Sequence, residues 1–131
     1  MLHKDYLFRP LYMMLDEITS TFSTIQVKRI KDLDQYLDDL YLKYISGNRN
    51  YFIEKDVQEI LNDKMLNDNQ ITLLAELFYR DALIQEDKTI KITLLQKAKA
   101  IFTYQSKQSD TFSLETVNKI TTIDNLLSAL K

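Results

Sequence analysis

The residues of this sequence that are best suited to acid–base chemistry are the aspartates of LDQYLDDLY, residues 33–41. Asp34 and Asp38 are four positions apart, which places them on the same face of a helix, one turn from each other. Two carboxylates can act as general acid and general base where burial or close coupling shifts their pKa values. The apolar pattern puts both on the polar face of a predicted helix, so we interpret them as solvated groups and not as a catalytic pair.

Other residue types that carry catalysis or bind metals are scarce. His3 is the only histidine, and the chain has no cysteine. Zinc sites need several such ligands, and a serine hydrolase needs a histidine base and a Gly-x-Ser-x-Gly turn. The segment NDKMLNDN, residues 62–69, offers oxygen ligands but lacks the glycine and the glutamate of a helix-loop-helix calcium site. The sequence therefore predicts no catalytic residues, no metal site and no cofactor.

Charge and hydropathy exclude two further classes of partner. The formal net charge is -2 at pH 7, which gives no positive field to attract nucleic acid. The one basic group, Lys28, Arg29 and Lys31, is interpreted as a solvated helix end. No segment reaches the roughly 18–20 apolar residues that a membrane span requires, and the first residues lack the apolar run of a signal peptide. We expect a cytoplasmic protein that binds neither nucleic acid nor membrane.

Aromatic residues gather along the second predicted helix and its exit. Tyr36, Tyr41, Tyr44 and Tyr51 supply large contact areas, each with one polar end. They could pack at the core and its rim, or they could form a binding or dimer surface. The sequence leaves both alternatives open, because it does not tell whether these rings are buried.

The elements that must position these residues are helices. The 131 residues contain 45% hydrophobic residues but only one glycine and one proline, a composition that disfavours the hairpins of sheet-rich folds. Strand-like alternation is almost absent. We predict an all-α fold in a single domain, residues 1–131, with five or six helices joined by short antiparallel connections. Its N-terminal helical part covers residues 5–65 and its C-terminal part residues 68–130.

Apolar spacing predicts three helices in the N-terminal part. The first covers about 7–25 and begins either near Asp5, with a kink at Pro10, or at Pro10 itself. The second covers 30–44 and ends at SGNRN, residues 46–50, where Gly47 is expected to take the left-handed cap. A third, shorter helix is expected over 53–61.

The C-terminal part is dominated by ITLLAELFYRDALIQE, residues 71–86, which is apolar nearly all round. Such a helix is buried on several sides, so we predict that it is the central helix, capped by Asn67 or Asp68. The next helix is expected over 94–102. The last covers 114–130 and is opened by Asp110 or Ser113.

The runs LLAELFYRDA and LLQKAKAIF, within residues 71–106, resemble a tetratricopeptide-type helical hairpin. Leu74, Ala75 and Phe78 would match its first helix, and Leu95 and Ala98 its second. The small residue of such a hairpin lets the helix axes approach, and the aromatic residue fills the space one turn further on. No second copy follows at the 34-residue period of that repeat.

A second resemblance covers most of the chain. The opening DYLFR, residues 5–9, followed by a long helix and by this hairpin near the other end, is similar to a small bacterial family of all-helical proteins that has no assigned function. This resemblance implies no catalytic residues.

The polar exceptions on the central helix indicate where a partner could bind. In the hairpin that this chain resembles, the groove side of the first helix would carry Thr72, Glu76, Tyr79 and Arg80. We predict that a partner segment docks there, with the tyrosine supplying area and the arginine pairing with a carboxylate. The alternative is that Arg80 pairs with Glu76, one turn back, and that Tyr79 only lines the core.

The function predicted from these patterns is a non-enzymatic protein–protein interaction or regulatory module. A self-associating structural protein, a homodimer through the N-terminal helices, is the second interpretation. An enzyme without a recognisable motif is the third.

Overall fold

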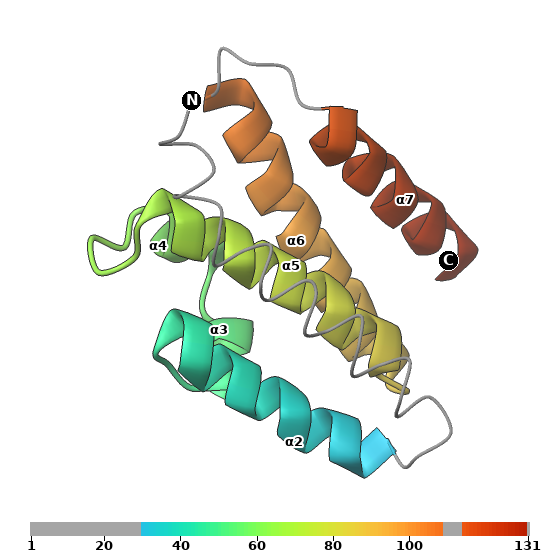
Figure 1. The fold of residues 1–131 in the computed structure, drawn as a ribbon. Coiled ribbons are helices and arrows are strands. Elements are labelled where there is room, and N and C mark those ends of the chain that lie inside the picture. The colour runs from blue at the N-terminus through green and yellow to red at the C-terminus, as the bar shows by residue number, and fades with distance from the viewer. Residues whose placement is uncertain (1–29, 109–113, 131) are drawn as a thin grey trace.

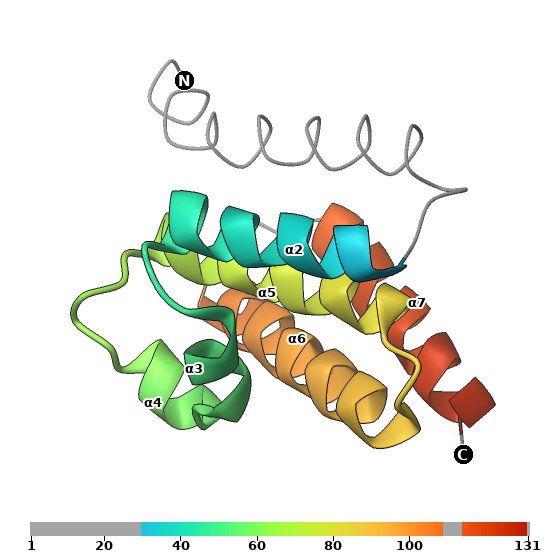
Figure 2. The ribbon, with the colours of Figure 1, turned by 90° about the horizontal axis from the view of Figure 1, so that it is seen from below.

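The computed structural model describes residues 30–108 and 114–130, and the described residues are helical without any strand. The helix α5 lies between α2 on one side and α6 on the other, and α7 packs against α6 (Figures 1 and 2). The predicted all-α fold is confirmed. The elements are α2 (Ile30–Leu40), a π-helical segment (Tyr41–Ile45), α3 (Arg49–Glu54), α4 (Val57–Leu61), α5 (Asp68–Ile84), α6 (Lys88–Gln108) and α7 (Leu114–Leu130).

The second predicted helix is present as α2 and the π-helical segment that continues it. Its inward face carries Leu37, Leu40, Tyr41 and Ile45, all buried. A π turn is wider than an α turn and is usually a short interruption in a helix. Here it makes Tyr41 a core residue, whereas Tyr44, which the apolar spacing had placed on the inward stripe, is only half-buried.

The end of this helix differs from the prediction for Gly47. Ser46 takes the left-handed conformation, with φ 62° and ψ 35°, and donates its backbone N–H to the carbonyl of Leu42. Gly47 has a negative φ, and its role is steric: a Cβ at that position would lie 2.4 Å from Cε2 of Phe52. The glycine is therefore needed for the close approach of the Phe52 ring and not for the cap.

The predicted third helix is in fact two short helices, α3 and α4. Asn48 accepts hydrogen bonds from the backbone N–H groups of Asn50 and Tyr51, so α3 begins within the segment predicted as a loop. The chain is extended at Lys55, where α3 ends. The ammonium group of Lys97 on α6 donates to the carbonyls of Ile53 and Lys55, the latter at 2.6 Å. The ammonium group thus donates to carbonyl groups at the end of α3, and this stabilises the break between α3 and α4.

The central position of α5 is confirmed. Asn67 and Gln70 form a capping box at its start, with Asn67 Oδ1 2.8 Å from the backbone nitrogen of Gln70. Most of the helix is buried, because α2 covers one side and α6 another. The buried residues on α5 are Ile71, Leu73, Leu74, Ala75, Glu76, Leu77, Phe78, Asp81 and Ala82.

The helices α5 and α6 form an antiparallel hairpin (Figure 1). Asp87 accepts hydrogen bonds from the backbone N–H groups of Thr89 and Ile90 and so caps the start of α6. The residues that carry the tetratricopeptide resemblance all have no exposed surface: Leu74, Ala75, Phe78, Leu95 and Ala98. They are buried within this hairpin, and the resemblance itself remains a prediction.

The last helix, α7, was predicted with its bounds at 114–130 and is observed there. Ile123 is the fully buried residue among residues 116–130, and Lys119 reaches α5. The buried apolar residues of α2 to α7 form one cluster. The predicted first helix, with its start at or before Pro10, and the caps at Asp110 or Ser113 lie outside the described residues.

Candidate functional site

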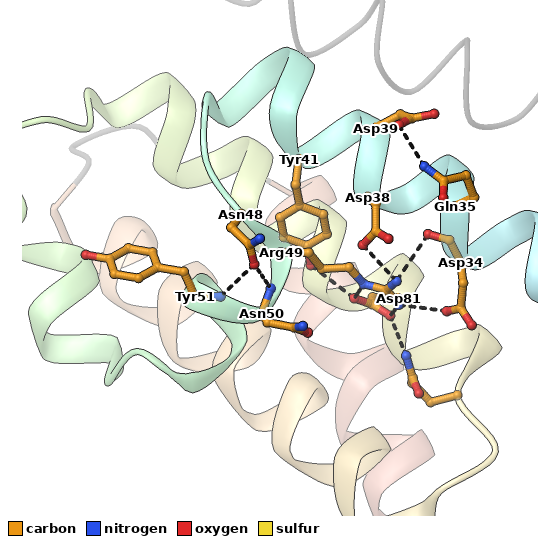
Figure 3. Close-up of polar contacts among 11 residues, drawn as sticks. Asp34, Gln35, Asp38, Asp39, Tyr41, Asn48, Arg49, Asn50, Tyr51 and Asp81 are labelled. Carbon is orange, nitrogen blue, oxygen red and sulfur yellow. Dashed lines mark hydrogen bonds and ion pairs between the residues drawn. The ribbon is translucent and has the colours of Figure 1, made fainter.

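The most heavily hydrogen-bonded side chain of the described residues is that of Arg49, at the start of α3. Arg49 is 9% exposed and Asp81, on α5, has no exposed surface. Nε of Arg49 lies 2.8 Å from Oδ2 of Asp81, and its Nη2 lies 2.5 Å from Oδ1 (Figure 3). This two-point contact is the geometry in which a guanidinium binds a carboxylate best.

The Asp81 carboxylate has two further donors. The Tyr41 hydroxyl lies 3.2 Å from Oδ2, and Nε2 of Gln85 lies 2.7 Å from Oδ1. Burial raises the pKa of Tyr41 well above its ordinary value, and the charge of Asp81 raises it further. Burial alone would lower the pKa of Arg49, but its hydrogen bonds to Asp81 and the carboxylate charge outweigh burial and raise it. Tyr41 therefore stays neutral and Arg49 stays charged.

The two aspartates that could have formed an acid–base pair also bind Arg49. Its Nη2 lies 3.0 Å from Oδ1 of Asp34, and its Nη1 lies 3.2 Å from Oδ1 of Asp38. Each aspartate side chain is 49% exposed. They are thus ion-paired and not simply solvated, which the sequence interpretation missed (Figure 3). The guanidinium between them is a permanent cation and cannot accept a proton. Its ion pairs with Asp34, Asp38 and Asp81 link α2, α3 and α5.

Of the residues predicted to line a groove, Thr72 and Glu76 lie on the side of α5 that faces α6 and α7. Thr72 donates to the carbonyl of Asp68 and contacts Oε1 of Gln105 on α6, both at 3.1 Å. Glu76 is only 6% exposed, and its Oε2 lies 3.0 Å from Nζ of Lys119 on α7. Helices of the same chain therefore cover the positions of Thr72 and Glu76.

Tyr79 and Arg80 are half-buried and have different surroundings. Nζ of Lys119 lies 5.0 Å from the centroid of the Tyr79 ring, and Cζ of Arg80 lies 5.3 Å from it. Cations at this range are attracted by the ring face. Tyr79 also packs against the core. We refer to Glu76, Tyr79, Arg80 and Lys119 together as the Tyr79 face.

Arg80 does not pair with Glu76, the alternative considered from the sequence, because the carboxylate of Glu76 binds Lys119. Nε of Arg80 is buried and has no hydrogen-bond acceptor among the described residues. Among the described side chains, those of residues 34–107 and 116–130, Arg80 has no carboxylate partner. The Tyr79 face thus holds two cations and one carboxylate, and the carboxylate is engaged with Lys119.

The four tyrosines predicted as a candidate aromatic surface do not form one surface. Tyr41 has no exposed area and belongs to the core, which corrects that prediction for this residue. Tyr36 and Tyr44 are half-buried against the core. Tyr51 is 54% exposed, and its hydroxyl accepts a hydrogen bond from Lys55.

The surface predicted for a homodimer is partly used within the chain. Leu37 and Leu40, from the apolar stripe of α2, are buried in the same core as α5. The other helix of that predicted dimer lies outside the described residues. Self-association through the N-terminal helices stays a prediction.

Two hollows open on the described surface. One, of about 570 Å³, lies between α6 and α7 and is crossed by the 2.6 Å ion pair of Lys99 and Asp124. The other, of about 290 Å³, lies beside Arg49 and includes the exposed Leu42. Both are open and mostly polar, unlike the apolar enclosed pockets that bind small molecules.

The described part of the chain has neither a metal-binding cluster nor a membrane-spanning helix. Within it, no three histidine, cysteine or acidic residues are grouped so that they could hold a metal ion. No helix there has the length and apolar character needed to cross a bilayer.

Comparisons of the chain with protein-family models, with curated proteins and with solved structures gave no match.

Proposed function

We propose that this protein is a non-enzymatic helical module that binds a partner protein through Tyr79 and Arg80. The observation that carries the proposal is the half-buried guanidinium of Arg80, whose Nε has no acceptor among the described residues. Buried donors in proteins are nearly always paired, and an unpaired one costs roughly 1–3 kcal/mol. A shift of the Arg80 side chain that exposed Nε to a partner's acceptor would recover this free energy on binding.

The composition of the Tyr79 face supports the proposal. Tyrosine and arginine are enriched among the residues that dominate binding energy at protein interfaces. Tyr79 is held in place by the core beneath it and by Lys119 beside it, so its ring loses little entropy when a partner docks. Among the described side chains, no carboxylate pairs with Arg80. Its guanidinium is therefore available to bind a carboxylate of the partner at two points.

The proposal is tested by affinity capture from lysate of the source cells, with the native chain and the variant Arg80→Gln as baits. We expect the native chain to retain a partner that Arg80→Gln loses, because the neutral amide cannot form the charge-assisted contact. Tyr104→Ala is the matched control, since Tyr104 is 43% exposed on α6, outside the Tyr79 face. Circular dichroism melting checks that all baits are folded.

The same experiment separates the alternatives. A partner retained equally by the native chain and Arg80→Gln would contradict a role for this face. Capture of nothing but copies of the chain itself would favour the self-associating structural protein.

A further inference from the structure

We infer that the Tyr79 face binds an acidic segment of its partner, and that Glu76 weakens this binding from within the chain because its charge partly neutralises Lys119. The inference rests on the proposed function and names the chemistry of the partner. It adds Lys119, on α7, as a second cation of the site. It also gives the buried carboxylate of Glu76 a role in setting the affinity.

The charges on the face determine its preference. Arg80 and Lys119 both lie near the ring of Tyr79, and among the side chains that the structure describes Glu76 is the acidic group in contact with either of them. The face therefore carries a net positive charge, although the formal net charge of the chain is -2. A cationic patch attracts acidic partners. Because the rest of an acidic protein repels such partners, they are directed to the patch.

The contact between Glu76 and Lys119 resembles the contact that a partner's carboxylate would make. The Lys119 ammonium lies 3.0 Å from Glu76 Oε2, and its side chain is still 23% exposed. Lysine has three donor hydrogens, so this ammonium can bind a second carboxylate while it keeps the first. The charge of Glu76 lowers the attraction of the face for that second carboxylate. Arg80 has no such carboxylate within the part of the chain that the structure describes, so it should make the stronger contact with the partner.

The experiment uses a defined probe in place of the unidentified partner. The probe is the peptide acetyl-Leu-Glu-Glu-Leu-amide, and acetyl-Leu-Gln-Gln-Leu-amide is its neutral match. Binding to the full chain is followed by NMR at low salt, through the Nε–H signal of Arg80 and the side-chain signals of Lys119. We expect the acidic peptide to shift both signals and the neutral peptide to shift neither, and added salt to weaken binding because exposed charges are screened.

Glu76→Gln is the decisive variant, and Asp124→Asn is its matched control. Both remove one negative charge, but Asp124 pairs with Lys99 away from the Tyr79 face. We expect Glu76→Gln to bind the acidic peptide about two- to fivefold more tightly, the range that exposed ion pairs contribute. Asp124→Asn should leave the affinity nearly unchanged. Arg80→Gln should abolish the binding.

If Glu76→Gln does not fold, a second variant, Lys119→Gln, tests the same inference. Lys119→Gln keeps the carboxylate of Glu76 and removes its partner, so we expect it to weaken peptide binding. Equal affinity of Glu76→Gln and Asp124→Asn, or of Lys119→Gln and the native chain, would overturn the role of Glu76 and Lys119. Failure of the acidic peptide to bind would overturn the partner chemistry. If the lysate partner were still lost with Arg80→Gln, the proposed function would stand without this inference.

Discussion

Arg49 and Asp81, 32 residues apart in the sequence, form a buried two-point ion pair with contacts of 2.8 and 2.5 Å. The pair links the start of α3 to the central helix. Asp34 and Asp38 extend it to α2. A buried ion pair stabilises a fold little relative to apolar residues, but the loss of one partner leaves a buried charge without compensation.

We therefore expect Asp81→Asn and Arg49→Met each to lower the free energy of unfolding by about 3–5 kcal/mol. Urea unfolding followed by circular dichroism measures the loss. Asp124→Asn is the control, because its pair with Lys99 is about half-exposed and should contribute less than about 1 kcal/mol. A loss at Asp81 no larger than the loss at Asp124 would show that the network does not hold the helices together.

The raised pKa of Tyr41 should make the stability of the fold depend on pH in the alkaline range. The pKa of Tyr41 in the folded chain lies above its ordinary value of 10.0, so above about pH 10 the unfolded chain releases this proton while the folded chain keeps it. The free energy of unfolding should fall as the pH rises through this range. Tyr41→Phe should reduce the slope and should cost about 1 kcal/mol at neutral pH, because Asp81 loses a donor.

The difference between native and Tyr41→Phe unfolding curves, measured in urea at a series of alkaline pH values, isolates this contribution. Other groups that titrate there cancel, including Lys97, whose pKa is lowered by burial. In addition, the Tyr41 hydroxyl should ionise above the ordinary pKa of tyrosine in a tyrosinate absorbance titration, and its step should be missing in Tyr41→Phe. Identical slopes for the two proteins would contradict the buried position of Tyr41.

Two substitutions in the turn after the π-helical segment should change the stability of the fold in opposite directions. Ser46→Gly should stabilise the fold by up to about 1 kcal/mol, because a left-handed conformation is strained for serine and not for glycine. Gly47→Ala should destabilise it by about 1–3 kcal/mol, because the new Cβ would overlap the Phe52 ring, which is 4% exposed and packed. Thermal melting measures both. The reverse pattern would indicate that Gly47, and not Ser46, has the left-handed conformation.

Lys97 and Lys99, both on α6, allow the contact of Lys97 with the end of α3 to be tested against an exposed ion pair. Lys97→Met removes the donor from the carbonyls of Ile53 and Lys55 and should cost about 1–3 kcal/mol. Lys99→Met removes only an exposed ion pair and should cost less than about 1 kcal/mol. Amide hydrogen exchange in α3 and α4 should accelerate in Lys97→Met alone. Equal exchange in the two variants would contradict the role of Lys97 at this helix end.

Local patterns in the sequence were sufficient to predict most of the described helices. The capping residues before α5 and the apolar character all round that helix identified it as central, because both signals lie within one element. The split between α3 and α4 was not predictable in this way, since the group at the break, Lys97, comes from a helix more than 40 residues later. The π turn also shifted the inward stripe by one residue, from Tyr44 to Ile45, and placed Tyr41 in the core.

The candidate site was predicted less well for a related reason. Glu76, Tyr79 and Arg80 were recognised as polar exceptions on an apolar helix, but Asp81, equally exceptional beside them, was not singled out. Its partner Arg49 lies in a segment that was predicted as a loop. Likewise nothing in the sequence paired Glu76 with Lys119, 43 residues later. Ion pairs between distant segments depend on how helices pack, which the apolar spacing of each helix does not specify.

The claim that this protein works by binding a partner through the Tyr79 face is tested most directly by crosslinking in the source cells. Tyr79 is replaced by photoreactive p-benzoylphenylalanine, and Tyr104, exposed on α6, receives the same replacement as the control. Our account predicts a covalent adduct to one other protein from position 79, identified by mass spectrometry, and none from position 104. No adduct from position 79, or adducts only to copies of the chain itself, would contradict it.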